Sequence, residues 1–430
     1  MIWNRRTWMG SVLAAMAGAK HAKPLFASED ASPADAADRI GVKTRRCLLL
    51  WMDGGPSQFE TFDPKAGVIT GGPTEAIRTA TPGVHFAAGL PRLAALSNDL
   101  CVIRTLTSKQ GEHERARYLG HTGFERVPAF ERPEIGSLFS HRLPASELPG
   151  FVSIGAPGYG PAYLGSEHAP LVIENPAESA ALMRRLQKRQ SRFEVLETLN
   201  QDFSKQFIGD SMDVGQTGQW LRSQSRKRVS DRAEQLQRLR GYLQSPLSDL
   251  IADADRASEA TSNRFATSVK MATDLLAAGV TCVEVSMPGW DTHQDNFGRT
   301  SRLTAELDTA MAAAIERLKA DGLWEETLLI WAGDFGRTPT INPASGRDHF
   351  PAISNMVLGG GGIPGGLVIG KTDALGRVIE DRPVTIADGL ATILGRIGIA
   401  ADETYQTAFG SPTEATDGGT VIPELALLSK

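Results

Sequence analysis

The stretch Cys47-Leu48-Leu49-Leu50-Trp51-Met52-Asp53-Gly54-Gly55-Pro56 decides the fold class. Its six apolar residues run without polar alternation and end at an aspartate and two glycines, which is typical of a central strand covered on both faces. Other runs of strand length also end in turns that contain Gly or Asp: Leu100 to Leu106, Val280 to Met287, Thr327 to Ala332, Asn355 to Leu358 and Leu367 to Ile369. Together these runs predict the strands of a buried sheet.

Helical patterns lie between these strands. The clearest one places apolar residues on one helix face before Gly322 ends the helix: Leu303, Leu307, Met311, Ile315 and Leu318. Strands that alternate with helices predict an α/β fold with a mostly parallel central sheet.

Composition excludes several classes of protein. The 430 residues carry 45 Lys+Arg against 50 Asp+Glu, a formal net charge of −5, so there is no basic excess for nucleic acid. With 41% hydrophobic and 22% charged residues the chain can bury a full core, which excludes general disorder. Cys47, Cys101 and Cys282 each lie in an apolar run. We expect packed thiols there and no cysteine-built metal site.

The N-terminus has the features of an export signal. Asn4-Arg5-Arg6-Thr7-Trp8-Met9 precedes a small-residue apolar stretch from Ser11 to Ala19, which resembles a twin-arginine signal within residues 1–27. The stretch is far short of the ~20 residues of a membrane-spanning helix, so no membrane span is expected after cleavage. This predicts a periplasmic or extracellular protein. The alternative is a cytoplasmic protein with an ordinary basic start.

Three other segments differ from the predicted α/β domain at 44–400. Residues 28–43, rich in Ala, Asp and Ser, are predicted to be a linker. Residues 177–275 are rich in Arg, Gln, Ser and Glu and are predicted to form a helical insertion or cap. Residues 401–430 are polar and are expected to be peripheral.

A glycine-rich segment imitates two nucleotide-binding motifs. Gly365 to Thr372 fits the P-loop pattern, and Gly360, Gly362 and Gly365 fit the dinucleotide fingerprint. Both motifs require a helix directly after the glycines, whereas Leu-Val-Ile here indicates a strand. We therefore expect no nucleotide cofactor, and interpret the segment as a mobile loop bordering the site.

Four short motifs follow predicted strands and carry Asp53, Asp291, His293, Asp334 and His349. Side chains at the carboxyl ends of parallel strands share one crevice. Three carboxylates and two imidazoles brought together raise one another's cost of burial, and a divalent cation removes that cost. This ligand set, without thiolate, suits Zn, Mn, Fe or Mg. Taken singly, each Asp could be a helix cap and each His a packed core residue.

With these residues considered, the chain resembles the exported bacterial proteins of domain-of-unknown-function family 1501. The likeness extends over about residues 44–400 and rests on five stretches: Leu50 to Gln58, Thr61 to Lys65, Gly289 to His293, Gly333 to Pro339 and Asp348 to Pro351. That family resembles a distant branch of the alkaline phosphatase and sulfatase superfamily. The resemblance implies a three-layer α/β/α sandwich with a divalent metal site at the carboxyl edge of the sheet.

The resemblance also implies a role for each residue. Asp53 takes the place of the first-strand metal aspartate, and Asp291 with His293 stands for an Asp-and-His ligand pair. Asp334 matches the aspartate of a later Asp-His dipeptide, and His349 matches the C-terminal histidine ligand. Two features depart from the superfamily: Phe335 replaces the dipeptide histidine, which removes a ligand from one of two metal positions, and the spacing of Asp291 and His293 is shorter.

The nucleophile departs from the superfamily too. There, a Ser, Thr or modified Cys opens a helix ten positions before the Gly of a Thr-Gly pair, and counting back from Gly123 reaches His113. An imidazole at that place could ligate a metal, act as general base or attack directly. Thr107 or Ser108 could instead supply a hydroxyl. His113 could also simply cap or pack.

Two functions follow from this interpretation. The first is an exported, metal-dependent hydrolase of phosphate or sulfate esters, small or polymer-borne, in which water, a hydroxyl or His113 attacks the ester. Arg337 would stabilise the anionic group, or alternatively pair with Asp334. The second is a catalytically inactive metal- or anion-binding envelope protein with the same fold. The oligomeric state is left open.

Overall fold

The computed structural model describes residues 43–128, 130–143, 148–175, 179–181, 241–242, 245–259, 263–407 and 410–427. The predicted export signal at 1–27 lies outside these residues, as does the predicted linker at 28–43 except for Lys43. No helix within the described ranges is long and apolar enough to cross a membrane.

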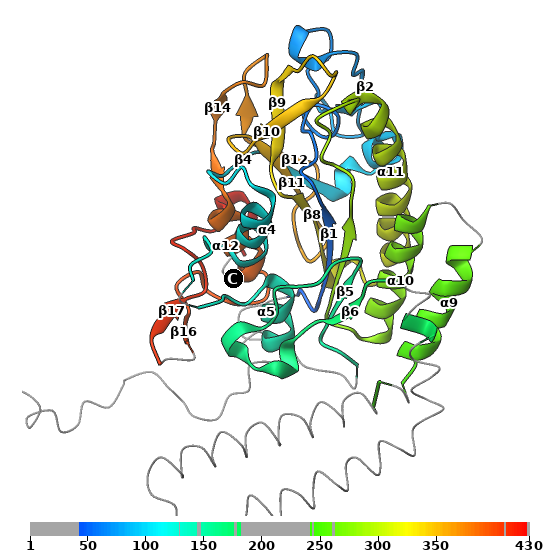
Figure 1. Ribbon diagram of the computed structural model, residues 1–430, viewed down its shortest axis with the longest axis vertical. Coiled ribbons are helices and arrows are strands. Elements are labelled where there is room, and N and C mark those ends of the chain that lie inside the picture. The colour runs from blue at the N-terminus through cyan, green and yellow to red at the C-terminus, as the bar shows by residue number, and fades with distance from the viewer. Residues whose placement is uncertain are drawn as a thin grey trace, which may run out of the picture.

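A nine-stranded sheet forms the centre of the described chain (Figure 1). Strand β11 is antiparallel to both of its neighbours, and all other neighbouring strands are parallel. Across the sheet the order is β12 (Leu367–Ile369), β4 (Leu100–Thr107), β11 (Ser354–Gly359), β8 (Thr327–Gly333), β1 (Arg46–Met52), β7 (Cys282–Met287), β5 (Phe151–Ile154) and β6 (Leu171–Ile173), with β15 (Val384–Thr385) also beside β4. All six predicted strand runs belong to this sheet, so the mostly parallel sheet is confirmed.

Helices cover both faces of the sheet, which makes a three-layer α/β/α sandwich (Figure 1). One layer contains α3 (Pro91–Ala95), α9 (Leu247–Glu259), α10 (Arg264–Ala278) and α11 (Asn296–Ala320). The other contains α4 (His113–Thr122), α5 (Ile135–Arg142) and α12 (Ile386–Gly395). The fold class predicted from the sequence is therefore confirmed.

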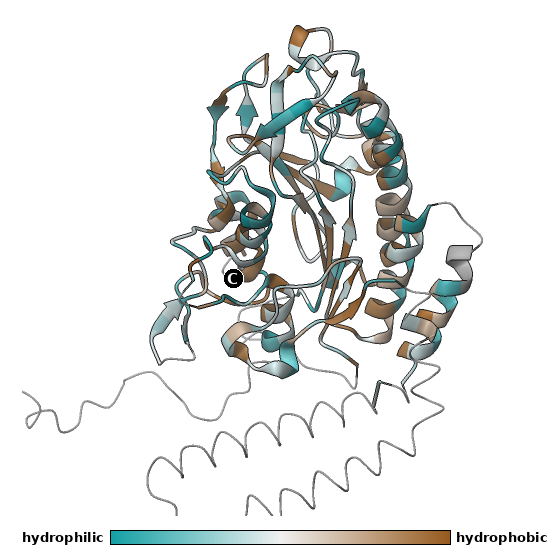
Figure 2. Cartoon of the chain, viewed as in Figure 1, coloured by the Kyte–Doolittle hydropathy of each residue, from teal (hydrophilic) through white to brown (hydrophobic). Residues whose placement is uncertain are grey.

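Strand β1 shows why its sequence is continuously apolar. Leu48 and Leu50 belong to the core with α10 and α11, whereas Leu49 and Trp51 belong to the core with α5 and α12. Successive side chains of a strand point to opposite faces, and here both faces are buried. Figure 2 shows the same pattern, since the central strands and the inner sides of the helices are hydrophobic.

Helix α11 follows the predicted apolar stripe. The four residues Leu307, Met311, Ile315 and Leu318 are fully buried, and Leu303 packs against them. The helix ends at Ala320, just before Gly322.

Short pairs of strands and 3-10 turns complete the described structure. The pairs are β2 (Ala76–Arg78) with β3 (His85–Ala87), β9 (Gly336–Ile341) with β10 (Arg347–Phe350), β13 (Lys371–Thr372) with β14 (Ile379–Asp381), and β16 (Thr404–Gln406) with β17 (Pro412–Glu414). The 3-10 turns are Ile69–Gly71, Ser97–Asp99, Ala162–Leu164, Ser166–His168, Trp324–Glu326 and Pro423–Leu425. The hairpin β9–β10 contributes directly to the candidate site.

The segment 177–275, predicted to be an insertion, is described only in part. Helix α10 packs on β1, β7 and α11, so it belongs to the sandwich itself. Residues 182–240 lie outside the described residues, and a helical insertion there stays a prediction. The C-terminal segment contributes to the core through Ile422 and Leu425, which are buried near α12.

Two further sequence predictions are confirmed. All three cysteines are buried free thiols in the strands, and burial raises the pKa of Cys101 to about 12. The segment that imitates a P-loop forms β12 and β13 with no helix between or directly after them. Its glycines therefore lack the helix N-terminus that would hold a phosphate.

Candidate functional site

The ends of β1, β7 and β8 bring three aspartates to one edge of the sheet. Asp53 follows β1, Asp291 follows β7 and Asp334 follows β8, and these strands are direct neighbours. The amide of Asp53 donates to the carbonyl of Met287 (2.9 Å), which ties the end of β1 to the end of β7. Gly54 has φ +105°, and a Cβ there would lie 2.5 Å from the amide nitrogen of Asp291. Only glycine allows the two loops to approach so closely.

The β9–β10 hairpin contributes one candidate ligand, His349. It also contributes Arg337, the partner of Asp291, and Asp348, the partner of His293. Arg347 is fully buried and pairs with Glu60 (3.0 Å), which anchors the start of β10. The next two residues contact the loop after β7, since Asp348 lies 2.8 Å from His293 and His349 lies 3.4 Å from Asp291. His349 is the register partner of Arg337 in β9.

Helix α4 begins at His113, as the ten-residue spacing predicts. The carboxylate of Glu112 accepts hydrogen bonds from the amides of Glu114 (3.2 Å) and Arg115 (3.0 Å), so Glu112 is the N-cap. Gly123 ends the helix with φ +79°, in the left-handed region. The cap therefore belongs to Glu112, which leaves the imidazole of His113 free for another role.

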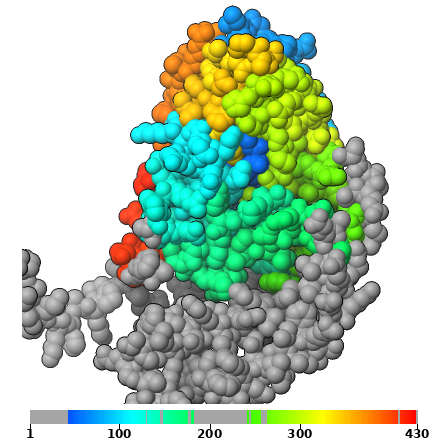
Figure 3. Space-filling model, viewed as in Figure 1, coloured from blue at the N-terminus to red at the C-terminus, as the bar shows by residue number. Residues whose placement is uncertain are grey.

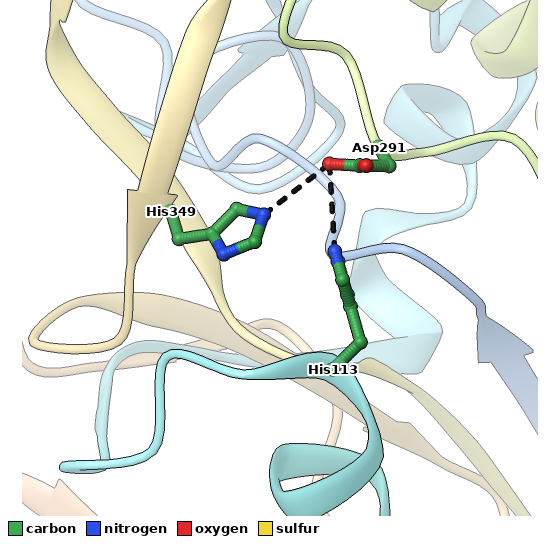
Figure 4. Close-up of side chains that lie close together, drawn as sticks. All are labelled: His113, Asp291 and His349. Atoms are coloured by element: carbon green, nitrogen blue, oxygen red, sulfur yellow. Dashed lines mark hydrogen bonds and ion pairs between the residues drawn. The ribbon is translucent and has the colours of Figure 1, made fainter.

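Three histidines and Arg337 approach one oxygen, Asp291 Oδ1. Figure 4 shows two of these side chains, His113 and His349, beside Asp291. The Nε2 atoms of His293, His349 and His113 lie 3.1, 3.4 and 3.5 Å from this oxygen. The Nε2 atoms of His293 and His349 are 2.9 Å apart. Ligand atoms of His113, Asp291 and His349 all lie within 4.8 Å of one another. In Figure 3, cyan, green and yellow segments of the chain meet around a small dark-blue patch that belongs to the start of the described chain.

The other ring nitrogen of each histidine faces a hydrogen-bond acceptor. Nδ1 of His113 lies 2.7 Å from Asp334 Oδ2, Nδ1 of His293 lies 2.8 Å from Asp348 Oδ1, and Nδ1 of His349 lies 2.7 Å from the Gly111 carbonyl. We assign the ring proton to Nδ1 in each case, because these acceptors have no proton to donate. In its neutral form, each ring then directs its Nε2 lone pair at the Asp291 carboxylate.

This arrangement fits a bound cation. Three nitrogen lone pairs and one carboxylate oxygen repel one another unless positive charge lies between them. Ligating histidines in metal sites characteristically donate the other ring N–H to a carboxylate or a backbone carbonyl, as all three do here. In addition, the buried Nε2 of His113 has no hydrogen-bond partner among the described residues. The donor set of nitrogen and oxygen suits Zn, Mn or Fe.

The protonation states of the candidate ligands differ. The hydrogen bond to Asp334 raises the pKa of His113, whereas burial lowers the pKa of His349. Burial opposes ionisation of Asp291, but the hydrogen bond and charge of Arg337 hold the pKa of that carboxyl below its ordinary value. At neutral pH, Asp291 is therefore a carboxylate and His349 is neutral, which are the forms that bind a cation.

The family model described as "Protein of unknown function (DUF1501)" matches residues 44–426, which include every residue of this site. The chain belongs to this family. The resemblance predicted over about 44–400 is thus confirmed and extends further toward the C-terminus. No curated protein sequence matches the chain.

Several solved structures are similar to this DUF1501 protein. A PsFucS1 sulfatase from Pseudoalteromonas sp. shows 14% identity and a TM-score of 0.37, over 91% of this chain and 77% of its own. A phosphonate monoester hydrolase of Agrobacterium radiobacter shows 14% and 0.38, over 89% and 77%. An alkaline phosphatase from the Antarctic bacterium TAB5 shows 14% and 0.33, over 74% and 92%. These low values add nothing to the geometry of the site.

Two aspartates that were predicted to be ligands have other partners in the DUF1501 chain. Asp334 is buried, and its carboxylate accepts from the Trp51 indole (3.1 Å), the Gly54 amide (3.1 Å) and His113. Asp53 forms an ion pair with Arg117. Burial raises the pKa of Asp53, an effect that Arg117 opposes.

Arg337, predicted to contact an anionic group or Asp334, instead pairs with Asp291 (2.7 Å). Its guanidinium is fully buried and donates to the backbone carbonyls of Gly54, Gly55 and Arg347. All three of its nitrogens are thereby engaged. This geometry suits a residue that positions Asp291 more than one that binds substrate.

The alternative hydroxyls lie in the sheet edge and its turn. Thr107 pairs with Thr385 at the end of β4. The Ser108 hydroxyl accepts a hydrogen bond from the Gln110 amide (3.0 Å). Within the described residues, neither side chain forms a hydrogen bond with the converging histidines.

Sequence reasoning missed Arg117, Asp348 and Trp51. Arg117 lies four residues after His113, a spacing that places both on one face of a helix, so the helix prediction could have found it. Asp348 adjoins His349, but only the hairpin shows that it faces His293 instead. From the sequence, Trp51 is expected to be a core residue. Its indole N–H contributes to the site only because it donates a hydrogen bond to Asp334.

Proposed function

We propose that this protein is an exported, metal-dependent hydrolase of phosphate or sulfate esters. The convergence of three imidazole Nε2 atoms on Asp291 Oδ1, each ring held by an acceptor at Nδ1, carries the proposal. Support for the ester class comes from the sequence motifs that resemble the alkaline phosphatase and sulfatase superfamily.

We assign the cation to His113, Asp291, His293 and His349. The ion supplies positive charge that polarises the ester and lowers the pKa of a water molecule. His113 is thus proposed as a ligand, because its Nε2 shares Asp291 Oδ1 with the other two rings. Hydrolysis then adds water across the P–O or S–O bond, and the alcohol leaves with a proton.

The surrounding residues hold the ligands in place. Asp334 and Asp348 accept the Nδ1 protons of His113 and His293, which fixes the orientation of both rings. Arg337 keeps Asp291 ionised and pointed at the histidines. Because these partners are fixed by the fold, the ligands need no rearrangement to bind an ion.

The test combines metal content with turnover. Elemental mass spectrometry of protein purified without a histidine tag should find a divalent ion that Asp291→Asn and His349→Ala remove. The metal-loaded protein should hydrolyse at least one of an aryl phosphate, an aryl phosphodiester and an aryl sulfate, and both variants should lose this activity. His85→Ala is the matched control, because His85 is exposed in β3.

Two results would contradict the proposal. No bound ion after incubation with Zn, Mn, Fe and Mg would refute the metal site. An ion that binds without turnover of any of the three probes would refute the hydrolase, and the metal-binding envelope protein would then be favoured.

The proposal places the enzyme outside the cytoplasm by the twin-arginine route. The sequence support is the Arg5-Arg6 pair before a short apolar stretch. Replacing both arginines by lysine should leave the uncleaved precursor in the cytoplasm of the host. Unchanged export of that variant would refute the route.

A further inference from the structure

A buried ion pair joins helix α4 to strand β7. Nε2 of His121 lies 3.0 Å from Oε1 of Glu284, and both side chains are 4% exposed. Nδ1 of His121 lies 2.8 Å from the carbonyl oxygen of Arg117. Because both ring nitrogens face acceptors, we assign a proton to each, which makes the ring an imidazolium opposite a carboxylate.

Stability alone is a weak explanation for such a pair. Two buried charges lose their hydration, and apolar residues of similar volume often replace a buried ion pair without loss of stability. Glu134 adds a second buried carboxyl group within electrostatic range of His121, and it accepts from the amides of Tyr159 (3.0 Å) and Gly160 (2.6 Å). A buried network with fixed partners is suited to hold one arrangement of side chains.

Strand β1 brings Trp51 against this pair. Glu284 is the register partner of Leu49 in β1, and Trp51 lies two residues further along β1, on the same face of the sheet. The ring centroids of Trp51 and His121 are 4.1 Å apart. A tryptophan ring attracts a cation within about 6 Å of its centre. The imidazolium therefore helps to hold the indole in place.

Trp51 in turn contacts the support of a candidate ligand. Its indole N–H donates to Oδ1 of Asp334 (3.1 Å), and Oδ2 of Asp334 lies 2.7 Å from Nδ1 of His113. Gly120 lets the indole lie this close to α4, since a Cβ there would be 2.4 Å from Trp51 Cη2. The contacts therefore run without a gap from the ion pair through Trp51 and Asp334 to His113.

We infer that His121, paired with Glu284, is a positioning residue of the candidate site. It fixes the Trp51 indole so that the N–H orients Asp334, and Asp334 then directs Nε2 of His113 toward the cation. His121 acts through these contacts and is not itself a ligand. The role of His113 as a ligand rests on the proposed function, whereas the geometry of the His113–Asp334 contact does not.

The first experiment removes the ion pair without leaving an unpaired charge. The double variant His121→Leu, Glu284→Leu replaces it with apolar side chains, so the protein should stay folded. In the metal-free protein, nitrogen NMR of the histidine rings should show a changed environment at His113. Zn²⁺ affinity, measured by competition with an indicator, should fall by roughly 3–30-fold. If the double variant does not fold, His121→Gln, which keeps a polar side chain opposite Glu284, takes its place.

The second experiment tests the route through Trp51. Trp51→Phe keeps an aromatic ring against His121 but removes the N–H that Asp334 accepts, so Zn²⁺ affinity should again fall. Combining Trp51→Phe with the loss of the ion pair should cost less affinity than the sum of the separate losses, because both changes act on one chain of contacts.

Tyr118→Phe is the matched control for a general structural effect on α4. The Tyr118 hydroxyl accepts from the amide of Arg132 (2.9 Å), and the Tyr118 side chain is buried. This variant should lower the Tm by leaving that amide unpaired, with Zn²⁺ affinity and the His113 resonances unchanged. An equal fall in Zn²⁺ affinity in Tyr118→Phe would show that weakening α4 is sufficient, and would overturn the inference.

Two other results would overturn it. One is an unchanged His113 spectrum when the ion pair is removed, even with weaker Zn²⁺ binding, because the effect would then not pass through His113. The other is a loss of affinity that is strictly additive with that of Trp51→Phe. Failure of the proposed function is a separate outcome, since the spectrum of the metal-free protein shows whether the ion pair orients His113 even if no Zn²⁺ binds.

Discussion

Replacing Asp334 by Asn should weaken metal binding at a residue that is not itself a ligand. The carboxylate accepts three hydrogen bonds, from Trp51, Gly54 and His113, whereas an amide has one oxygen and adds a donor. If the amide nitrogen faces His113, the ring proton moves to Nε2 and blocks the lone pair. If the amide oxygen faces His113, the ring still loses the charge that makes it basic.

The expected magnitude follows from both orientations. Loss of a carboxylate partner of a ligating histidine lowers metal affinity by roughly 10–100-fold, or about 1.4–2.7 kcal/mol. One buried donor is left unpaired in either case, which lowers the free energy of unfolding by about 1–3 kcal/mol. The variant should therefore bind Zn²⁺ more weakly while remaining folded.

Competition against a zinc-binding indicator measures the affinity, and nitrogen NMR of the histidine rings reports the tautomer of His113. Asp348→Asn is the comparison variant. The Asp348 side chain is 57% exposed and can rotate its amide oxygen toward His293, so metal affinity should fall less in this variant than in Asp334→Asn. An Asp334→Asn affinity within twofold of wild type would show that the Asp334 contact does not support the ligand.

Other predictions concern the core beneath the site. Burial alone would lower the pKa of His121, but the charge and hydrogen bond of Glu284 (3.0 Å) raise it to about 9. The His121–Glu284 pair then contributes on the order of 3 kcal/mol to the free energy of unfolding below pH 6.5, and this contribution is lost as pH rises through about 9. Urea unfolding across pH 6 to 10 measures the contribution, and a free energy of unfolding that does not change with pH would contradict it. Gly120→Ala places a Cβ 2.4 Å from Trp51 Cη2, so thermal unfolding should show a loss of about 1–3 kcal/mol, whereas an unchanged Tm would refute the crowding. A thiol reagent should not label the three buried cysteines in the native protein, and rapid labelling before unfolding would count against their burial.

The sheet was predictable because a strand that is buried on both faces has a continuously apolar sequence. Apolar runs such as 47–52 and 327–332 located their strands to within a residue or two. The direction of β11 was not predictable, since an apolar run reads the same for a parallel and an antiparallel neighbour. Direction depends on the connection, and the chain reaches β11 directly from the β9–β10 hairpin.

The convergence of the motifs was predictable from the sheet, but the partners of each residue were not. Parallel strands bring the loops after β1, β7 and β8 to one edge whatever their sequences. Whether an aspartate there can hold a metal depends on whether its carboxylate already accepts hydrogen bonds from other groups of the protein. For Asp53 and Asp334 those donors come from α4 and from Trp51, and no motif specifies them.

Arg337 bears on how the proposed ion would be bound and released. Its guanidinium joins carbonyls of residues 54 and 55 to residues near 337, positions separated by 282 and 283 residues in sequence. The entropy lost in bringing these segments together is therefore part of the free energy of folding. Ion binding does not have to order these segments again. A chelator should strip the ion and leave a folded apoprotein that reloads without a slow refolding phase, so metal exchange is set by diffusion and ligand release.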